Sequence, residues 1–233
     1  MAEIWHGLIK AIELIISLDP EVMEIAGRSL RISVTSCLLA SFICIPLGSL
    51  IHFHNFRGKR AVINIIQTFF SLPTVCVGLF VFVLFSRAGP MGGLGIMFTP
   101  TAMVIGQMIL ITPILLGLTI SALSGVSKEI VDTAISLGAS SFQTTVAVLR
   151  EARYAVLAAV TMGFGRAIAE VGCAMMVGGN IRGFTRVITT TISLETSKGE
   201  LELSIALGII LLSLALIVNV ALNRLQLGYS RGK

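Results

Sequence analysis

Residues 155–180 read AVLAAVTMGFGRAIAEVGCAMMVGGN, and this stretch decides what kind of fold the chain can adopt. Nearly all of its side chains are apolar or small, and the run is long enough for a helix to cross a lipid bilayer, which takes about 20 residues. Arg166 and Glu170 interrupt it with opposite charges four residues apart. A charge that faces lipid costs at least about 2.5–3.5 kcal/mol, so this pair requires surroundings of protein or water.

The composition extends the same conclusion to the whole chain. Of its 233 residues, 55% are hydrophobic and only 12% are charged, and the mean hydropathy is +0.95. A soluble domain carries about 25% charged residues, and a protein of this size cannot bury so much apolar surface in its own core. The sequence therefore indicates an integral membrane protein with lipid as a partner. The excess of Lys and Arg then bears on topology and lipid head groups, and we expect no nucleic-acid partner.

Five apolar runs have about the length that a bilayer requires. They fall at 29–51, 61–86, 101–123, 154–177 and 203–222. Three of them contain or border a proline (Pro46, Pro73 and Pro113), which membrane helices tolerate when neighbouring groups satisfy the freed carbonyl. The sequence therefore predicts an all-α integral membrane fold with five core transmembrane helices.

The N-terminal segment 1–19 has a different pattern. It carries polar residues along one helical stripe and isoleucines and a leucine opposite, over about 15 residues, too few to span squarely. The stripe consists of His6, Lys10, Glu13 and Ser17. We expect an amphipathic helix at the membrane interface, with a short tilted span as the alternative. The Asp19-Pro20-Glu21 sequence, with a cap, a proline and an acid in order, predicts the start of the next helix.

The distribution of positive charge predicts the orientation, because cytoplasmic loops are enriched in Lys and Arg. One set of segments carries Arg57, Lys59, Arg60, Lys128, Arg150, Arg153, Arg224, Arg231 and Lys233. The opposite set carries Arg28, Arg31, Arg87, Arg182, Arg186 and Lys198. Nine positive residues against six place the 52–60 loop, the 124–153 loop and the C-terminus in the cytoplasm.

The predicted cytoplasmic loop 124–153, SGVSKEIVDTAISLGASSFQTTVAVLREAR, has helical periodicity where a simple connector would be short and polar. Two apolar sets at helical spacing lie on either side of Gly138. This pattern predicts two short helices joined at the glycine. They would either present a surface to a partner below the membrane or pack on their own protein.

Within this loop, DTAISLGASSF resembles the EAA loop of ABC-transporter permeases, in which Glu-Ala-Ala is followed by three further residues and then by Gly. The corresponding residues here are Asp132, Thr133, Ala134, Gly138, Ala139 and Ser140. Val148 matches a later Ile of the pattern, but Arg150 and Glu151 replace its Leu-Pro ending. The resemblance implies a coupling loop at about 124–150, inside a permease domain 20–233, that seats in an ATP-binding subunit.

A second stretch, AEVGCAMMVGGNIRGFTRVITTTI at 169–192, resembles the Glu-Phe-Gly-Ala…Gly-Asn-Ile-Pro-Gly-x-Thr sequence of sulfate and molybdate permeases. Val171 replaces the Phe and Arg182 replaces the Pro. The version found here looks most like tungstate permeases, and the resemblance covers residues 21–223.

The family resemblance implies a permease subunit of an ABC importer for tungstate or a related oxyanion (molybdate or sulfate), and not an enzyme. It implies a homodimer with two ATP-binding subunits and an external substrate-binding protein, in a bacterial or archaeal plasma membrane crossed several times. The chain contains no G-x-x-x-x-G-K-[ST] motif, so ATP and Mg²⁺ are expected in the partner and no cofactor in this chain. The alternative is a secondary anion transporter or channel that needs no ATPase.

The candidates for the translocation path are Arg166, Glu170 and Asn180. Arg166 and Glu170 can touch on one helix face. In one interpretation they form a buried ion pair that locks helices together; in the other, Arg166 attracts an anion and Glu170 offsets its charge so that the anion can leave.

The four cysteines lie singly in apolar stretches, and His52 and His54 lack acidic or thiol partners, so no metal site is expected.

Overall fold

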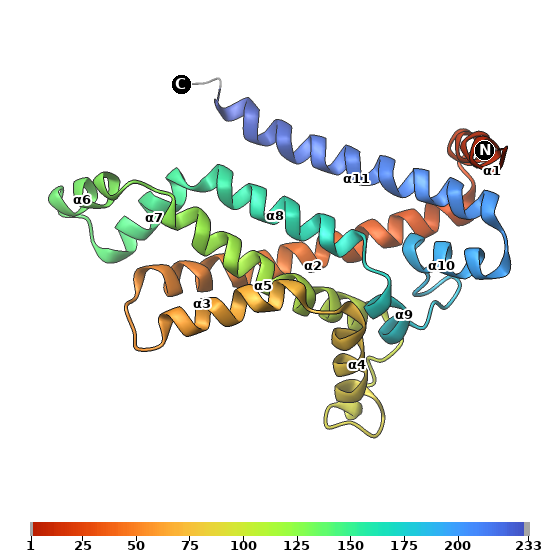
Figure 1. Ribbon diagram of the computed structural model, residues 1–233, viewed down its shortest axis with the longest axis horizontal. Helices are drawn as coiled ribbons and strands as arrows, with labels where there is room; N and C mark the ends of the chain where they lie inside the picture. Colours follow the sequence, from red (N-terminus) through yellow and green to blue (C-terminus); the bar gives the residue numbers. More distant parts are fainter. Residues whose placement is uncertain (1, 231–233) are drawn as a thin grey trace.

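The computed structural model describes residues 2–230, and the side chains of residues 4–222 and 224. Within that part of the chain every regular element is a helix, which confirms the all-α prediction. The α-helices are α1 (Ala2–Ile16), α2 (Pro20–Phe53), α3 (Lys59–Thr68), α4 (Thr74–Phe85), α5 (Pro100–Ser124), α6 (Lys128–Ser136), α7 (Ser141–Glu151), α8 (Arg153–Ile168), α9 (Gly172–Gly178), α10 (Ile188–Lys198) and α11 (Leu201–Ser230), with short 3-10 helices η1 (Phe69–Ser71) and η2 (Gly92–Leu94). The long helices α2, α5, α8 and α11 run along one direction (Figure 1).

Three of the described helices are long and apolar enough to cross a membrane: Pro20–Phe53, Pro100–Ser124 and Leu201–Leu222. Two further spans are possible only if each of two bent helix pairs counts as one. A membrane-spanning helical fold is therefore confirmed, and five spans remain a prediction.

Runs 61–86 and 154–177 are each interrupted by a bend. The first bends by 102° between η1 and α4, and the second by 59° between α8 and α9. At the first break Leu72 is extended (ψ 122°), as the residue before a proline prefers, and Pro73 precedes the first residue of α4. Pro46 and Pro113, by contrast, lie inside α2 and α5, which continue past them.

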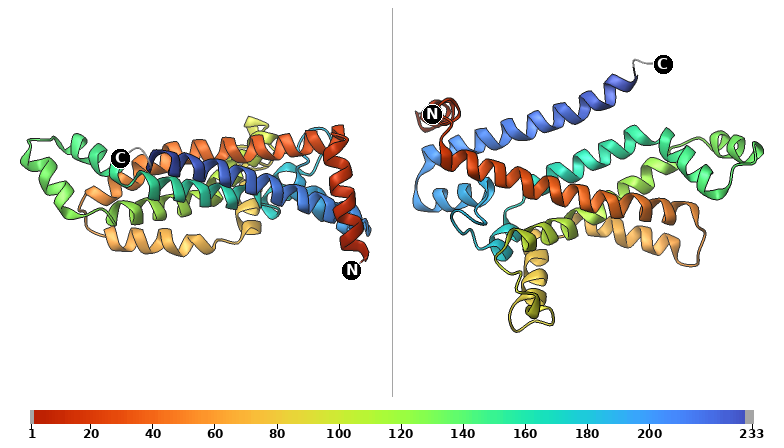
Figure 2. Two further views of the ribbon diagram at one scale, coloured as in Figure 1. Left: turned by 90° about the horizontal axis from the view of Figure 1, so that it is seen from above. Right: turned by 180° about the vertical axis from the view of Figure 1, so that it is seen from behind.

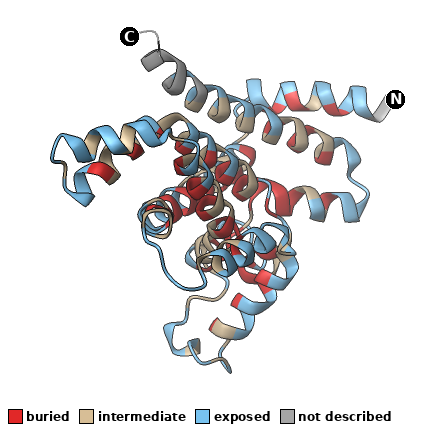
Figure 3. Ribbon diagram, turned by 60° about the vertical axis from the view of Figure 1, so that its left-hand side comes forward, coloured by how far each residue is buried: buried red, intermediate tan, exposed pale blue. Residues whose placement is uncertain are grey.

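The core lies where α2, α5 and α8 meet and where α9 packs against α4 and α5. Figure 3 shows that the buried residues gather in the middle of the molecule, where the helices pack against one another. The outer sides of α2 and α11 are apolar but exposed: the side chain of Phe42 is 81% exposed and that of Leu212 is 72% exposed. Such surfaces are stable only in an apolar solvent, so they are the faces that lipid would cover.

The N-terminal amphipathic helix α1 lies across the ends of α2 and α11 (Figure 2). It buries Ala11 and Leu14 against α11, and a Cβ at Gly7 would lie 2.5 Å from Ile205 Cγ2, so the two helices approach closely. The predicted helix start follows directly: Asp19 Oδ1 accepts a hydrogen bond from the Val22 N–H at 3.0 Å. The crossing orientation suits a helix in the plane of the membrane, and the interfacial location remains a prediction.

The orientation can be tested by labelling introduced cysteines in intact cells. We expect an impermeant thiol reagent to label Gly93→Cys, and to label Asn55→Cys only after the cells are opened. Both residues are exposed, and a Cβ at Gly93 meets open space, whereas one at Gly92 would lie 2.3 Å from a backbone oxygen. Cys76, the exposed native cysteine, is first replaced by Ser. The reverse labelling pattern would contradict a cytoplasmic loop at 124–153.

Candidate functional site: a two-helix segment and a broken helix

Residues 128–151 form the two short helices α6 and α7 at one end of the molecule (Figure 1). Gly138, between them, has φ +81°, a left-handed conformation that few other residues adopt without strain. Ser140 and Gln143 then form a capping box: Ser140 Oγ accepts from Gln143 N–H at 3.3 Å, and Gln143 Oε1 accepts from Ser140 N–H at 2.8 Å. The turn that the glycine predicted is therefore fixed by local chemistry.

The outer side of this two-helix segment is apolar. Leu137 is 82% exposed, Phe142 is 77% exposed and Ile135 is 59% exposed, while Val148 is buried toward the bundle. A hollow of about 570 Å³ lies on this side, lined by Leu137, Gly138, Ala139, Phe142, Gln143, Val146, Ala147 and Arg150. Asp132 and Thr133 are exposed and Ala134 is partly buried. Large apolar side chains clustered on a protruding segment are typical of a protein-binding surface.

The break between α8 and α9 contains Glu170, whose side chain is 1% exposed. Its Oε1 accepts a hydrogen bond from the Cys173 N–H at 2.7 Å, and its Oε2 lies 3.3 Å from the Arg166 guanidinium. The shorter contact is the one to the start of α9, where free N–H groups favour a carboxylate. Glu170 therefore caps α9 as well as pairing with Arg166.

Arg166 is the more accessible partner of this pair. Its side chain is 34% exposed, and it lies in the last turn of α8 rather than midway along a continuous span. The expected pair is thus present, but at a helix end. Of the nearby small residues, Cys173 is buried against α4 and α5, whereas a Cβ at Gly165 would meet open space and Ala169 is exposed.

The short helix α9 is held by close packing on α4 and α5. A Cβ at Gly78 would lie 2.9 Å from Cys173 Cα, and one at Gly106 would lie 2.5 Å from Cys173 Sγ. Both glycines therefore let a helix approach where a larger residue would displace it. The start of α9, and with it the position of Glu170, is fixed by this contact.

Asn180 follows α9 and has φ +50°, next to Gly179 at φ +70°. Its Oδ1 is buried and has no hydrogen-bond partner among the described residues. The whole of α9 separates Asn180 from Glu170, and the structure shows no hydrogen bond between Asn180 and the Arg166–Glu170 pair. The three candidate path residues are therefore not brought together as one cluster.

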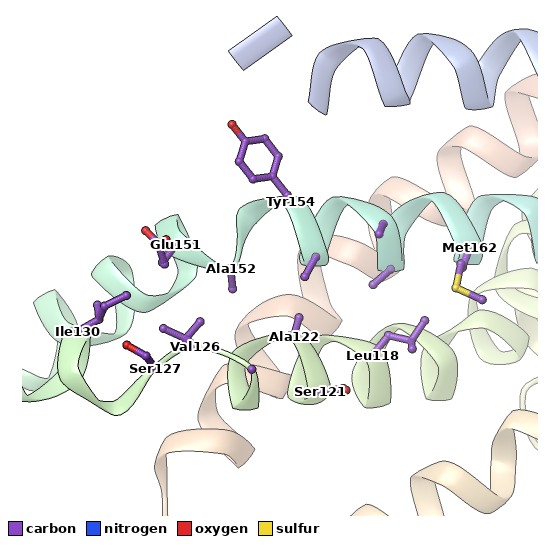
Figure 4. A pocket seen from close by; sticks show the side chains of 14 residues that line it. Leu118, Ser121, Ala122, Val126, Ser127, Ile130, Glu151, Ala152, Tyr154 and Met162 are labelled. Atoms are coloured by element: carbon purple, nitrogen blue, oxygen red, sulfur yellow. The ribbon is translucent and has the colours of Figure 1, made fainter. Parts of the chain in front are cut away.

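Two features were not expected from the sequence. A groove of about 770 Å³ runs between α5 and α8, from Glu151 and Ile130 at one end to Leu118 and Met162 at the other (Figure 4). It is lined mainly by small residues, including Ala122, Gly125, Ala155, Ala158 and Ala159. Its end at Met162 lies four residues, about one helical turn, before Arg166 in α8. In the sequence, the repeated alanines along 155–159 were the feature that could have indicated this groove.

The second feature joins distant parts of the chain at the other end of the molecule. Arg182 donates two hydrogen bonds to Glu21, at 2.9 and 2.6 Å, and Arg28 donates to the Arg186 carbonyl at 2.8 Å. These contacts fasten the loop after α9 to the first turns of α2. No group of three or more His, Cys, Asp or Glu side chains that could hold a metal ion occurs within the described residues.

Comparison with known proteins agrees with this arrangement. Residues 44–231 match the family described as "Binding-protein-dependent transport system inner membrane component". The chain is 40% identical to the tungstate uptake system permease protein TupB of Peptoclostridium acidaminophilum, over 97% of this chain and 99% of that protein. It is 38% identical to TupB of Campylobacter jejuni, over 96% of this chain and 93% of that protein. A probable sulfate transport system permease of Prototheca wickerhamii is more distant, at 24% identity over 92% and 87%.

Among solved structures, the chain is similar to a chain of the inward-facing MetNI methionine ABC transporter, with a TM-score of 0.73, 17% identity and coverage of 91% of this chain and 97% of that one. That likeness shows a shared fold. The family match covers most of the sequence and includes both the two-helix segment and the broken helix. The chain therefore belongs to the family of inner-membrane components of binding-protein-dependent transport systems, and it is a multi-pass membrane permease subunit rather than an enzyme.

Proposed function

We propose that this chain is the permease subunit of an ABC importer for tungstate or a closely related tetrahedral oxyanion such as molybdate or sulfate. It acts as a homodimer in a bacterial or archaeal plasma membrane, together with two ATP-binding subunits and an external substrate-binding protein. The identity to tungstate permeases over nearly the full length supports the substrate class. The observation in the structure that carries the proposal is the partly exposed Arg166 side chain, 34% exposed, beside a broken helix.

The geometry at the break suits the passage of an anion. Irregular backbone within a membrane is stable only where protein buries it or where it lines an aqueous cavity, and transporters place such breaks at their substrate path. Glu170 accepts a hydrogen bond from the Cys173 N–H and another from Arg166 at 3.3 Å, and about a third of the Arg166 side chain remains exposed. Arg166 offers positive potential to a dianion, and Glu170 reduces that potential so that the ion is released.

Energy for uptake comes from the partner subunits. Moving a dianion inward against a negative interior costs roughly 4–5 kcal/mol per 100 mV, at about 2.3 kcal/mol per charge. The chain has no phosphate-binding loop of its own, so ATP and Mg²⁺ bind in the ATP-binding subunits. The two-helix segment 128–151, with its apolar outer side, is the surface on which such a subunit docks.

A secondary anion transporter or channel would use Arg166 and Glu170 without an ATPase. In that case the exposed Leu137 and Phe142 have no partner to cover them. The two functions therefore differ in whether this surface binds a soluble ATPase.

We expect the double variant Leu137→Glu with Phe142→Glu to lose the ATP-binding subunit during purification while its own folding yield stays near that of the wild type. Both side chains are more than three-quarters exposed, so two charges there disturb the docking surface and not the core. Phe56→Glu is the matched control, because Phe56 is an exposed phenylalanine in the α2–α3 loop, outside the segment. Equal recovery of the ATPase with all three proteins would contradict docking on this surface.

A further inference from the structure

The helix break at Glu170 is fastened by side chains from three other helices. On α5, the Gln107 Nε2 donates a hydrogen bond to the Ala167 carbonyl at 3.1 Å, in the last turn of α8. The Ser36 hydroxyl on α2 lies 3.0 Å from Gln107 Oε1. On α10, the Thr189 hydroxyl donates to the Glu170 carbonyl at 2.7 Å. Gln107 is 5% exposed and Ser36 is fully buried, so these are interior contacts.

The contact made by Gln107 acts on the residues that orient the Arg166 guanidinium. Ala167 is adjacent to Arg166, and its carbonyl also accepts from the Glu170 N–H at 3.2 Å across the break. The Gln107 amide thus joins α5 and α2 to the one turn that holds both members of the charged pair. Buried polar side chains generally have hydrogen-bond partners, and here one N–H of the Gln107 amide donates to Ala167 while its oxygen lies within hydrogen-bond distance of Ser36.

We infer that Gln107 is a positioning residue for transport: it fixes the end of α8 so that the Arg166 guanidinium stays on the open side while Glu170 remains at the start of α9. The inference rests on the proposed function, because it requires Arg166 to act on the anion. Gln107 makes no hydrogen bond to the side chain of Arg166 or Glu170, and it acts through the Ala167 carbonyl.

The chain allows a substitution that removes this contact and leaves no group unbonded. In Gln107→Leu, the Ser36 hydroxyl still reaches the Ile32 carbonyl at 2.7 Å, and the Ala167 carbonyl keeps the Glu170 N–H. Thr119→Val is the matched control. It removes a buried hydroxyl from the same helix α5, but that hydroxyl has no hydrogen-bond partner among the described residues.

The experiment uses the full complex with ATP-binding subunits in lipid nanodiscs and measures amide hydrogen exchange by mass spectrometry. We expect Gln107→Leu to raise the exchange rate of peptides covering 165–172 between about 2-fold and about 12-fold, the factor for one net hydrogen bond. Thr119→Val should leave it unchanged. In liposomes, the maximal rate of tungstate uptake per folded complex should fall at least about 2-fold in Gln107→Leu, with the KM for the loaded binding protein unchanged, since external docking is not affected.

A uniform loss of protection over all helices, or unchanged exchange at 165–172, would show that Gln107 does not specifically hold the break. Faster exchange with an unchanged uptake rate would show that this hold has no role in transport. Arg166→Met, measured in parallel, separates the inference from the proposed function. If Arg166→Met transports normally, the path assignment fails, whereas the exchange result still reports whether Gln107 fastens α8.

Discussion

The double variant Arg166→Met with Glu170→Gln is expected to fold and to lose oxyanion uptake roughly 10- to 150-fold, the worth of a hydrogen bond to a charged group. Glutamine at position 170 retains an oxygen that can accept from the Cys173 N–H, so the cap of α9 is kept. Both charges are removed together, so no buried carboxylate is left without its ion-pair partner, a situation that typically costs 3–5 kcal/mol. The readout is uptake into liposomes, normalised to folded protein.

The single variants distinguish a transport role from a structural one. Arg166→Met leaves Glu170 buried with a negative charge, and its folding yield should fall. Glu170→Gln leaves the positive charge of Arg166 without its counter-charge, so the anion should be held more tightly and released more slowly. If the double variant folds well and transports like the wild type, the pair is a structural lock and Arg166 does not line the path.

Gly138→Val should uncouple transport from ATP hydrolysis. Its φ of +81° lies in the left-handed region, which costs a residue with a Cβ roughly 1–2 kcal/mol, while the space around a Cβ is open. The turn between α6 and α7 must therefore change shape, and docking of the ATP-binding subunit should weaken about 5- to 30-fold. Association of the purified subunits and ATP-driven uptake are the two measurements.

Two further variants isolate the effect of this turn. Gly138→Asn should keep coupling, because asparagine tolerates the left-handed conformation. Gly58→Val places the same strain, at φ +92° and also in open space, in the α2–α3 loop outside the segment. Loss of coupling in Gly58→Val to the same extent as in Gly138→Val would show that the effect is general strain, and normal association in Gly138→Val would contradict the docking segment.

The parts of the fold that local chemistry determines were predictable from the sequence. The helix start at Asp19 and Pro20 and the turn at Gly138 follow from residues whose preferences act within a few positions. The membrane environment was also predictable, because the length and apolar composition of a run are enough to indicate that it can cross a bilayer.

The sequence did not reveal the two helix breaks, and the one at Glu170 depends on tertiary contacts. Pro46, Pro73 and Pro113 look alike in the sequence, but of these three only Pro73 lies between two helices, while α2 and α5 continue past the other two. The break at Glu170 contains no proline. It is held by Gln107 and Thr189, which lie 60 residues before Ala167 and 19 residues after Glu170.

The central claim is that this permease moves an oxyanion with energy from a separate ATPase. The most direct measurement is tungstate uptake into liposomes that contain the permease and the ATP-binding subunits with ATP at their nucleotide-binding side, with the loaded binding protein on the other side. The account predicts uptake against the tungstate gradient that stops when either ATP or the binding protein is left out. Tungstate flux of the same size through the permease alone, without ATPase or binding protein, would contradict it and favour a channel or secondary transporter.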